Sequence, residues 1–198
     1  VMDNRSHEKG LLGVVADIIK VEKKYETAIE TALGGSIQNI VTDNEQTAKR
    51  MIEFLKKNKF GRATFLPLTQ IRSHGGIAQP QALNEAGVIG LADTLVMVED
   101  KYLELAGSLL GRTLVVDHID HGLAIARKYR QSIRIVTLEG DLINPGGSMT
   151  GGAFKNSSNL LSRRREIEEL EQAVQKLRAD VAKTEQEIAE LKNNRSGY

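Results

Sequence analysis

Apolar positions in the first seventy residues follow two spacings, which predict an alternation of strands and helices. Short apolar runs are typical of buried strands, whereas apolar residues three and four apart are typical of one face of a helix. Gly34 and Gly35 end the first helix, and Thr42, Asp43 and Glu45 mark the beginning of the second. The pattern predicts a strand over 14–19, a helix over 22–33, a strand over 37–41, a helix over 45–58 and a strand over 62–66.

The same order of elements returns in the second half of the chain. Residues 21–25 (Val-Glu-Lys-Lys-Tyr) match residues 98–102 (Val-Glu-Asp-Lys-Tyr) at an offset of 77. Two copies are too few for a solenoid, so we predict an α+β fold of two related mixed α/β subdomains. With small gaps, the alignment pairs Leu33–Gly34 with Leu110–Gly111, Ile40–Val41 with Val115–Val116, Ala48 with Ala124, and the strand ending at Leu66 with the strand ending at Leu138.

The last segment has the heptad pattern of a coiled-coil helix. A helix over residues 163–194 would extend roughly 48 Å, far beyond a compact domain. Its apolar seam needs a second helix, which we expect either in another molecule or in an N-terminal arm of the same protein that precedes Val1. The seam consists of Ile167, Leu170, Val174, Leu177, Val181, Thr184, Ile188 and Leu191.

These patterns divide the chain into five segments. Residues 1–9 are polar and without pattern, and the chain begins with Val, so we interpret them as the remnant of an N-terminal coiled-coil arm. Glycines, a proline and weak periodicity indicate a connector between the subdomains. The predicted division is 1–9 for the arm remnant, 10–69 for the first subdomain, 70–90 for the connector, 91–160 for the second subdomain and 161–198 for the C-terminal arm.

A glycine-rich stretch over residues 144–152 follows two predicted strands, 134–138 and 141–143. Glycine is favoured where φ is positive or where another backbone approaches closely. Gly147 and Gly152 have the spacing of a phosphate-binding P-loop, but Ala153 and Phe154 follow instead of Lys and Ser or Thr. A flexible linker is the plain alternative. We predict an interface at a sheet edge, formed by Gly146, Gly147, Ser148, Met149, Thr150, Gly151 and Gly152.

Four basic residues lie where the globule meets the last helix. They are Lys155, Arg163, Arg164 and Arg165. Cations at the beginning of a helix oppose the helix dipole, so contact with DNA phosphates is a hypothesis for these residues, and a solvated face is the alternative. The formal net charge of +1 requires that any nucleic-acid binding come from such a local patch. Four Phe, four Tyr and no Trp leave little surface for base stacking.

Residues 117–121 (Asp-His-Ile-Asp-His) contain the one cluster of metal-ligand residue types. His118 and His121 could share one side of a helical turn, but their spacing matches no zinc motif. We therefore expect Asp117 or Asp120 to cap a helix and predict no metal site. The sequence contains no cysteine and none of the catalytic motifs that we considered, so we predict no enzymatic activity in this chain. It also has no membrane-spanning apolar run.

The stretch Gly-Gly-Ser-x-Thr-Gly-Gly at the end of a duplicated globule, followed by a heptad helix, resembles the hinge domain of structural maintenance of chromosomes (SMC) proteins, most closely the bacterial ones. Residues 25–36 also resemble the first hinge helix of that family. The resemblance implies a homodimerisation module at the apex of a coiled coil whose far end carries an ATPase head outside this chain. ATP, Mg²⁺ and accessory subunits would belong to that head, and this chain would need no cofactor.

The resemblance further implies sequence-independent DNA binding and a cytoplasmic, nucleoid-associated protein that condenses and segregates chromosomes. Members of the family can carry a run of lysines after the second glycine pair, whereas residues 153–156 contain only Lys155. An alternative from another class stays open. In it, the two halves enclose a small regulatory molecule near residues 146–152, and the heptad helix transmits the signal.

Overall fold

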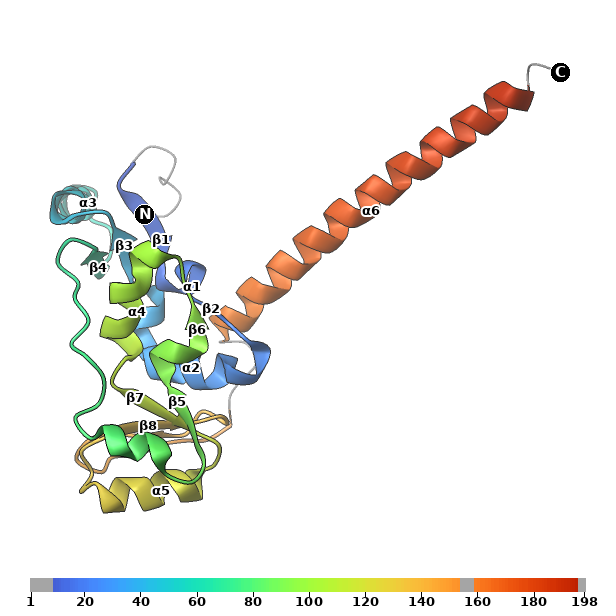
Figure 1. Cartoon of the computed structure of the whole chain (residues 1–198). Coiled ribbons are helices and arrows are strands. Elements are labelled where there is room, and N and C mark those ends of the chain that lie inside the picture. Colours follow the sequence, from blue (N-terminus) through green and yellow to red (C-terminus); the bar gives the residue numbers. More distant parts are fainter. Residues whose placement is uncertain (1–8, 154–158, 196–198) are drawn as a thin grey trace. The chain divides into compact units, whose positions relative to one another are not determined.

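The computed structural model describes residues 9–153 and 159–195, and the chain divides into two compact units, Val1–Leu161 and Ser162–Tyr198. The strands that the structure describes all lie in the first unit, and the second unit is formed by the helix α6 (Leu160–Arg195) beyond Leu161 (Figure 1). The predicted α+β fold with a long last helix is confirmed. The arm remnant predicted over residues 1–9 lies outside the described residues except for Lys9.

The first half of the globule contains a three-stranded sheet of order β1-β3-β4. β1 pairs antiparallel with β3, and β4 pairs parallel with β3. The elements of the first half are β1 (Leu11–Val14), α1 (Val15–Ile18), β2 (Lys20–Val21), the 3-10 helix η2 (Lys23–Tyr25), α2 (Glu26–Leu33), η3 (Gly34–Gln38), β3 (Ile40–Thr42), α3 (Glu45–Lys57) and β4 (Phe65–Pro67).

The second half contains a five-stranded sheet of order β10-β9-β8-β7-β5. Its elements are η4 (Pro80–Asn84), β5 (Val88–Leu91), η5 (Ala92–Leu95), β6 (Val96–Met97), η6 (Asp100–Tyr102), α4 (Leu103–Leu110), β7 (Thr113–Val116), α5 (Ile119–Lys128), β8 (Arg134–Thr137), β9 (Leu142–Ile143) and β10 (Met149–Thr150).

Equivalent hydrogen bonds confirm the internal repeat. The Asp43 amide donates to the Gly10 carbonyl over 3.0 Å, and the Asp117 amide donates to the Gly87 carbonyl over 2.9 Å. Both halves then share the order strand, short helix, strand, 3-10 turn, helix, strand, helix and strand. β2 and β6, which are equivalent in this repeat, pair antiparallel with each other and connect the halves. The two halves are therefore related by an approximate two-fold axis, up to β4 and β8.

The structure shifts the predicted alignment after the first helix. The loop from α2 to β3 contains η3, whereas only two residues separate α4 from β7, so the offset falls from 77 to 74. In the alignment predicted from the sequence, the partner of Ile40–Val41 in the second half lies one residue too far along the chain. The partners of Ala48 and Leu66 lie two residues too far along, because apolar runs align equally well when they are shifted. The equivalent pairs are Ile40 with Leu114, Ala48 with Gly122, and Leu66 with Val136.

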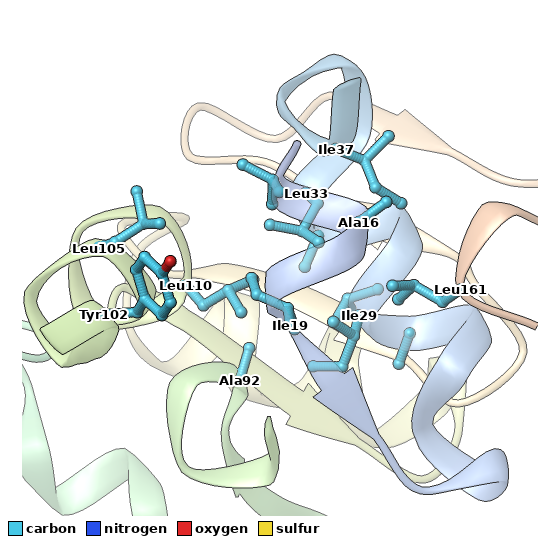
Figure 2. Packing of buried hydrophobic residues seen from close by; sticks show 14 of the residues in the cluster. Ala16, Ile19, Ile29, Leu33, Ile37, Ala92, Tyr102, Leu105, Leu110 and Leu161 are labelled. Carbon is cyan, nitrogen blue, oxygen red and sulfur yellow. The ribbon is translucent and has the colours of Figure 1, made fainter. Parts of the chain in front are cut away.

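The hydrophobic core is shared by the two halves. α1, α2 and α4 contribute buried residues to one cluster, which also contains Val115 and Val136 from the five-stranded sheet and Val41 from the other sheet (Figure 2). α5 covers the opposite face of the five-stranded sheet, and α3 packs on the three-stranded sheet. The two predicted subdomains are thus structural repeats around a common core.

Two predicted elements differ from the structure. The run 14–19, predicted as one strand, contains α1, in which the Ile19 amide donates to the Val15 carbonyl over 3.0 Å. A short buried apolar run cannot be assigned to strand or helix by periodicity alone. The end of the predicted connector 70–90 is β5, which pairs with β7. Glycines in the segment 70–90 had indicated a loop, but Gly90 lies within β5, where the register of its pairing with β7 shifts. Such an irregularity in a strand is a common place for glycine.

The beginning of α6 is held in the first unit by Glu30 of α2. The Leu160 and Leu161 amides donate to the Glu30 carboxylate over 3.1 and 3.3 Å, and these are amides that a helix beginning leaves without an intrahelical acceptor. Glu30 is only 8% exposed. Burial raises the pKa of Glu30 above its usual range; the two amide hydrogen bonds oppose this shift and the charge of Glu26 adds to it.

We expect a Glu30→Gln variant to gain stability relative to the wild type as the pH rises from 4 to 7.5. A carboxyl group whose pKa is higher in the folded than in the unfolded chain stabilises the fold at a pH below its unfolded pKa, about 4.3 for Glu. This stabilisation is lost as the pH rises through the folded pKa. Urea unfolding at both pH values measures the effect. Glu139→Gln, at an exposed carboxyl, is the control. An identical pH dependence of wild type and Glu30→Gln would contradict the assignment.

Candidate functional site

The predicted interface stretch forms a β-hairpin at the edge of the five-stranded sheet. Gly146 and Gly147 lie in its turn with φ of 87° and 93°, which side chains disfavour. The Gly146 amide donates to the Gln131 carbonyl over 2.8 Å, and the Gly147 amide donates to the Asn144 carbonyl over 3.0 Å. The first glycine pair is therefore required by the turn itself.

The hairpin makes β10 the outermost strand of its sheet. The Asn144 amide donates to the Ser148 carbonyl over 2.9 Å, and the next pair in the ladder is Ile143 with Met149. Antiparallel pairs alternate between bonded and non-bonded, so the backbone N–H and C=O of Met149 point to the open side. The Met149 residue is 53% exposed. β10 thus presents an edge that can accept a further strand.

The second glycine pair borders a groove of about 580 Å³ beside α2. An added side chain at Gly151 would meet Asp141 Oδ1 at 2.5 Å, and Gly152 has a φ of 134°. Among the residues that line the groove, only Glu30 is charged, and its carboxylate is already bonded to the beginning of α6. The groove therefore lacks a free charged group for a small ionic ligand within the described residues.

The internal repeat identifies a second open edge, on β4. In the second half, β9 pairs with the outer side of β8, through Ile135 and Ile143 among others. β4 is the equivalent of β8, yet in the described part of the chain no strand lies on its outer side. The Ile40 amide donates to the Thr64 carbonyl over 2.9 Å, so the backbone of Thr64 faces β3. Successive residues of a strand direct their N–H and C=O to opposite sides, so those of Phe65 point away from β3, to the open side.

An apolar groove lies next to this second edge. It has a volume of about 450 Å³ and is lined by Ile52, Leu55, Phe60 and Ala63 together with Lys56 and Arg62. Phe60 is 60% exposed, and its ring packs 5.8 Å from that of Phe54. This edge was not predicted from the sequence. The available signal was the repeat, since the second half has a hairpin that the first half lacks.

The predicted basic residues are only partly free to bind phosphate. Arg164 Nε lies 3.6 Å from Glu168, and Arg165 Nη1 lies 2.8 Å from Glu169, one helical turn further along α6. Arg163 is exposed. Lys155 lies outside the described residues. The structure therefore brings three of the four predicted residues together and leaves Arg163 as the best placed for an external anion.

The predicted coiled-coil residues lie along α6 within the second unit. They keep the heptad spacing, and the large apolar ones are 46% to 67% exposed. Thr184 is also exposed, and its hydroxyl donates to the Asp180 carbonyl over 2.9 Å. A regular helix with a continuous exposed apolar seam is what a coiled-coil partner requires.

The histidine cluster is explained by helix capping and pairing. The ring of His118 accepts a hydrogen bond from the Asp120 amide at the beginning of α5, so the predicted cap is wrong in residue but right in kind. His121 Nδ1 lies 2.7 Å from Asp117 Oδ1, and this contact lowers the pKa of Asp117. In residues 9–153 and 159–192, no three potential ligands converge on a metal-sized site. No described helix is both long and apolar enough to cross a bilayer.

The family model of the flexible hinge domain of SMC proteins matches residues 8–126. The chromosome partition protein Smc of Bacillus subtilis (strain 168) is 43% identical over 188 residues, which cover 93% of this chain and 16% of that protein. The Smc protein of Desulfitobacterium hafniense (strain Y51) is 45% identical over 183 residues, covering 92% and 15%. The chain thus spans less than a fifth of the length of these relatives.

Solved structures agree with the sequence relatives. The crystal structure of an asymmetric dimer of the Geobacillus stearothermophilus SMC hinge domain superposes with a TM-score of 0.80 and 38% identity, covering 93% of this chain and 75% of that chain. The Pyrococcus furiosus Smc hinge domain with an extended coiled coil has a TM-score of 0.62 and 30% identity, covering 96% and 70%. Repeat, fold and sequence therefore agree, and the chain belongs to the family of SMC hinge domains.

Proposed function

We propose that this chain is a homodimerisation hinge in which β10 of one copy pairs with β4 of the other. The observation that carries the proposal is the open outer side of β4, where the equivalent strand β8 is covered by β9. A partner's β10 supplies the missing strand, with Met149 facing Phe65 across a new ladder. The crystal structure of an asymmetric dimer of the Geobacillus stearothermophilus SMC hinge domain supports dimer formation as such.

Two such contacts form at once in a two-fold dimer, because each copy carries one β10 edge and one β4 edge. The interface residues predicted from the sequence, Gly146 to Gly152, then act in two ways. The first pair shapes the hairpin turn, and the remaining residues present the pairing edge. The apolar groove at Phe60 would receive an exposed side chain of the partner's hairpin.

In the full-length protein, this hinge would join two coiled-coil arms of an SMC protein that partitions chromosomes. The name of the Bacillus subtilis relative supports this role. By family resemblance, the ATPase head with its ATP, Mg²⁺ and accessory subunits lies outside this chain, which itself would need no cofactor and catalyse no reaction. The place of action would be the nucleoid in the cytoplasm.

We also propose that the α6 seam pairs with an N-terminal arm of the same protein, and that Lys155 and Arg163 to Arg165 contact DNA phosphates without sequence preference. The exposed apolar seam supports the first proposal. The exposed Arg163 supports the second. The small-molecule alternative has less support, because the groove beside Gly151 and Gly152 offers no free charged group among the described residues.

For the dimer, we expect Met149→Pro to convert the protein to a monomer at micromolar concentration. Proline removes the outward N–H of β10 but no hydrogen bond to β9, so the globule should stay folded. Sedimentation equilibrium measures the mass, and far-UV circular dichroism checks the fold. Met149→Ala, which keeps the N–H, is the matched control and should remain largely dimeric. A dimeric Met149→Pro protein would move the interface away from β10.

A mixing experiment separates pairing of β10 with β4 from pairing of two β10 strands. We expect Phe65→Pro also to be monomeric, since it removes the outward N–H of β4. Mixed with Met149→Pro, it should recover a weak heterodimer through the one intact contact. If Phe65→Pro alone stays fully dimeric, β4 is not the partner strand.

For the arm, we expect amides of residues 174–191 to be more protected from hydrogen exchange in the full-length protein than in this chain. An unpartnered amphipathic helix gains little burial and frays. Exchange measured by mass spectrometry should leave the amides of α5 unchanged in both. Equal protection of 174–191 in the two proteins would contradict an intramolecular partner.

For DNA, we expect replacement of Lys155 and Arg163 to Arg165 by Glu to weaken binding to all sequences alike. The slope of log affinity against log salt should flatten by about one unit per lost phosphate contact. Arg163→Glu alone should weaken binding more than Arg165→Glu, because Arg165 is already paired with Glu169. Lys176→Glu with Arg178→Glu, further along α6, is the control. Unchanged binding would assign the four residues to a solvated face.

A further inference from the structure

A cavity of about 610 Å³ lies in the first unit, between the connector and the beginnings of β7 and β8. This volume is within the range of small-molecule sites, roughly 300 to 1,000 Å³. Its polar lining comes from six side chains, and among the described residues no Asp or Glu lines it. The six are His74, Gln79, Arg112, Thr113, Ser132 and Arg134.

Arg134 is a half-buried cation in this cavity without a carboxylate partner in the described structure. Its Nη1 donates to the Ala32 carbonyl over 2.9 Å and to Thr113 Oγ1 over 3.4 Å. Burial lowers the pKa of Arg134 from its usual value, and no acidic side chain opposes that shift. A guanidinium group has five N–H donors, so most of its donors remain for a ligand.

Arg112 supplies a second guanidinium on the exposed side of the same cavity. Its Nη2 donates to the His74 carbonyl over 3.1 Å, which holds the side chain against the connector. Ser132 also lines the cavity, and its hydroxyl donates to the Tyr129 carbonyl over 2.6 Å. Ile77, Leu109 and Pro145 form an apolar part of the lining. Two guanidinium groups, with no Asp or Glu among the described lining residues, give the cavity a positive potential in partly dehydrated surroundings.

We propose that this cavity binds a small organic anion through a phosphate group. Guanidinium groups bind phosphate oxygens in pairs, and two of them can provide donors on different sides of a tetrahedral phosphate group. The apolar wall would contact the organic part. Neither Arg112 nor Arg134 lies on β10 or β4, the strands of the proposed dimer contact, whereas Pro145 of the apolar wall belongs to the turn of the β9–β10 hairpin.

The test is a titration of the ¹⁵N-labelled protein with inorganic pyrophosphate at constant ionic strength, followed by amide chemical shifts. We expect saturable shifts at residues 74–79, 112–113 and 132–134. Arg112→Gln should weaken binding at least about tenfold, the size of one charge-assisted hydrogen bond. Arg72→Gln is the matched control: Arg72 is also exposed and also donates to backbone carbonyls, but it does not line the cavity.

Each outcome decides the proposal. Binding that is lost in Arg112→Gln and retained within about twofold in Arg72→Gln, as expected for a screened surface charge, supports the site. Absence of saturable shifts at millimolar pyrophosphate, equal weakening in both variants, or equally strong binding of acetate would overturn it. Shifts at these residues with a duplex oligonucleotide but not with pyrophosphate would instead assign the cavity to the DNA backbone.

Discussion

The antiparallel pairing of β2 with β6 fixes the relation between the two halves of the globule. Val21 lies opposite Val96 in this short ladder, and α2 and α4 pack into one cluster beside it. Neither half buries its inner apolar surface alone. The sheets, the outer helices α3 and α5, and the two open edges all take their positions from this shared core. A change that loosens it should affect both edges together.

The departure from two-fold symmetry creates the functional asymmetry of the molecule. The second half continues past β8 into the β9–β10 hairpin, whereas the first half ends its sheet at β4 and runs into the connector. One half therefore carries an extra strand and the other an open position for one. In the proposed dimer, β10 of each copy would pair with β4 of the other, which would give a closed dimer with two like contacts instead of an open chain of molecules.

Two charged side chains, the buried Glu30 and the half-buried Arg134, lie where α2 meets other parts of the globule. Glu30 accepts hydrogen bonds from the beginning of α6, and Arg134 donates to the Ala32 carbonyl near the end of α2. Each arrangement matches the charge to a helix end, the anion to a beginning and the cation to an end. α2 thus contacts both the beginning of α6 and Arg134 of the cavity proposed to bind a phosphate-bearing anion.

The sequence by itself determined the repeat, most helices and strands, the heptad arm and, through the glycine stretch, one sheet edge, because periodicity and glycine placement are local properties. It could not determine that 14–19 contains a helical turn, that β5 begins inside the supposed connector, or the register of the repeat, since similar apolar runs fit more than one alignment. Only the tertiary structure decided which edge of β4 is open and that Arg112 and Arg134 meet in one cavity. Those features depend on contacts between residues far apart in the chain, for which a local pattern carries no signal.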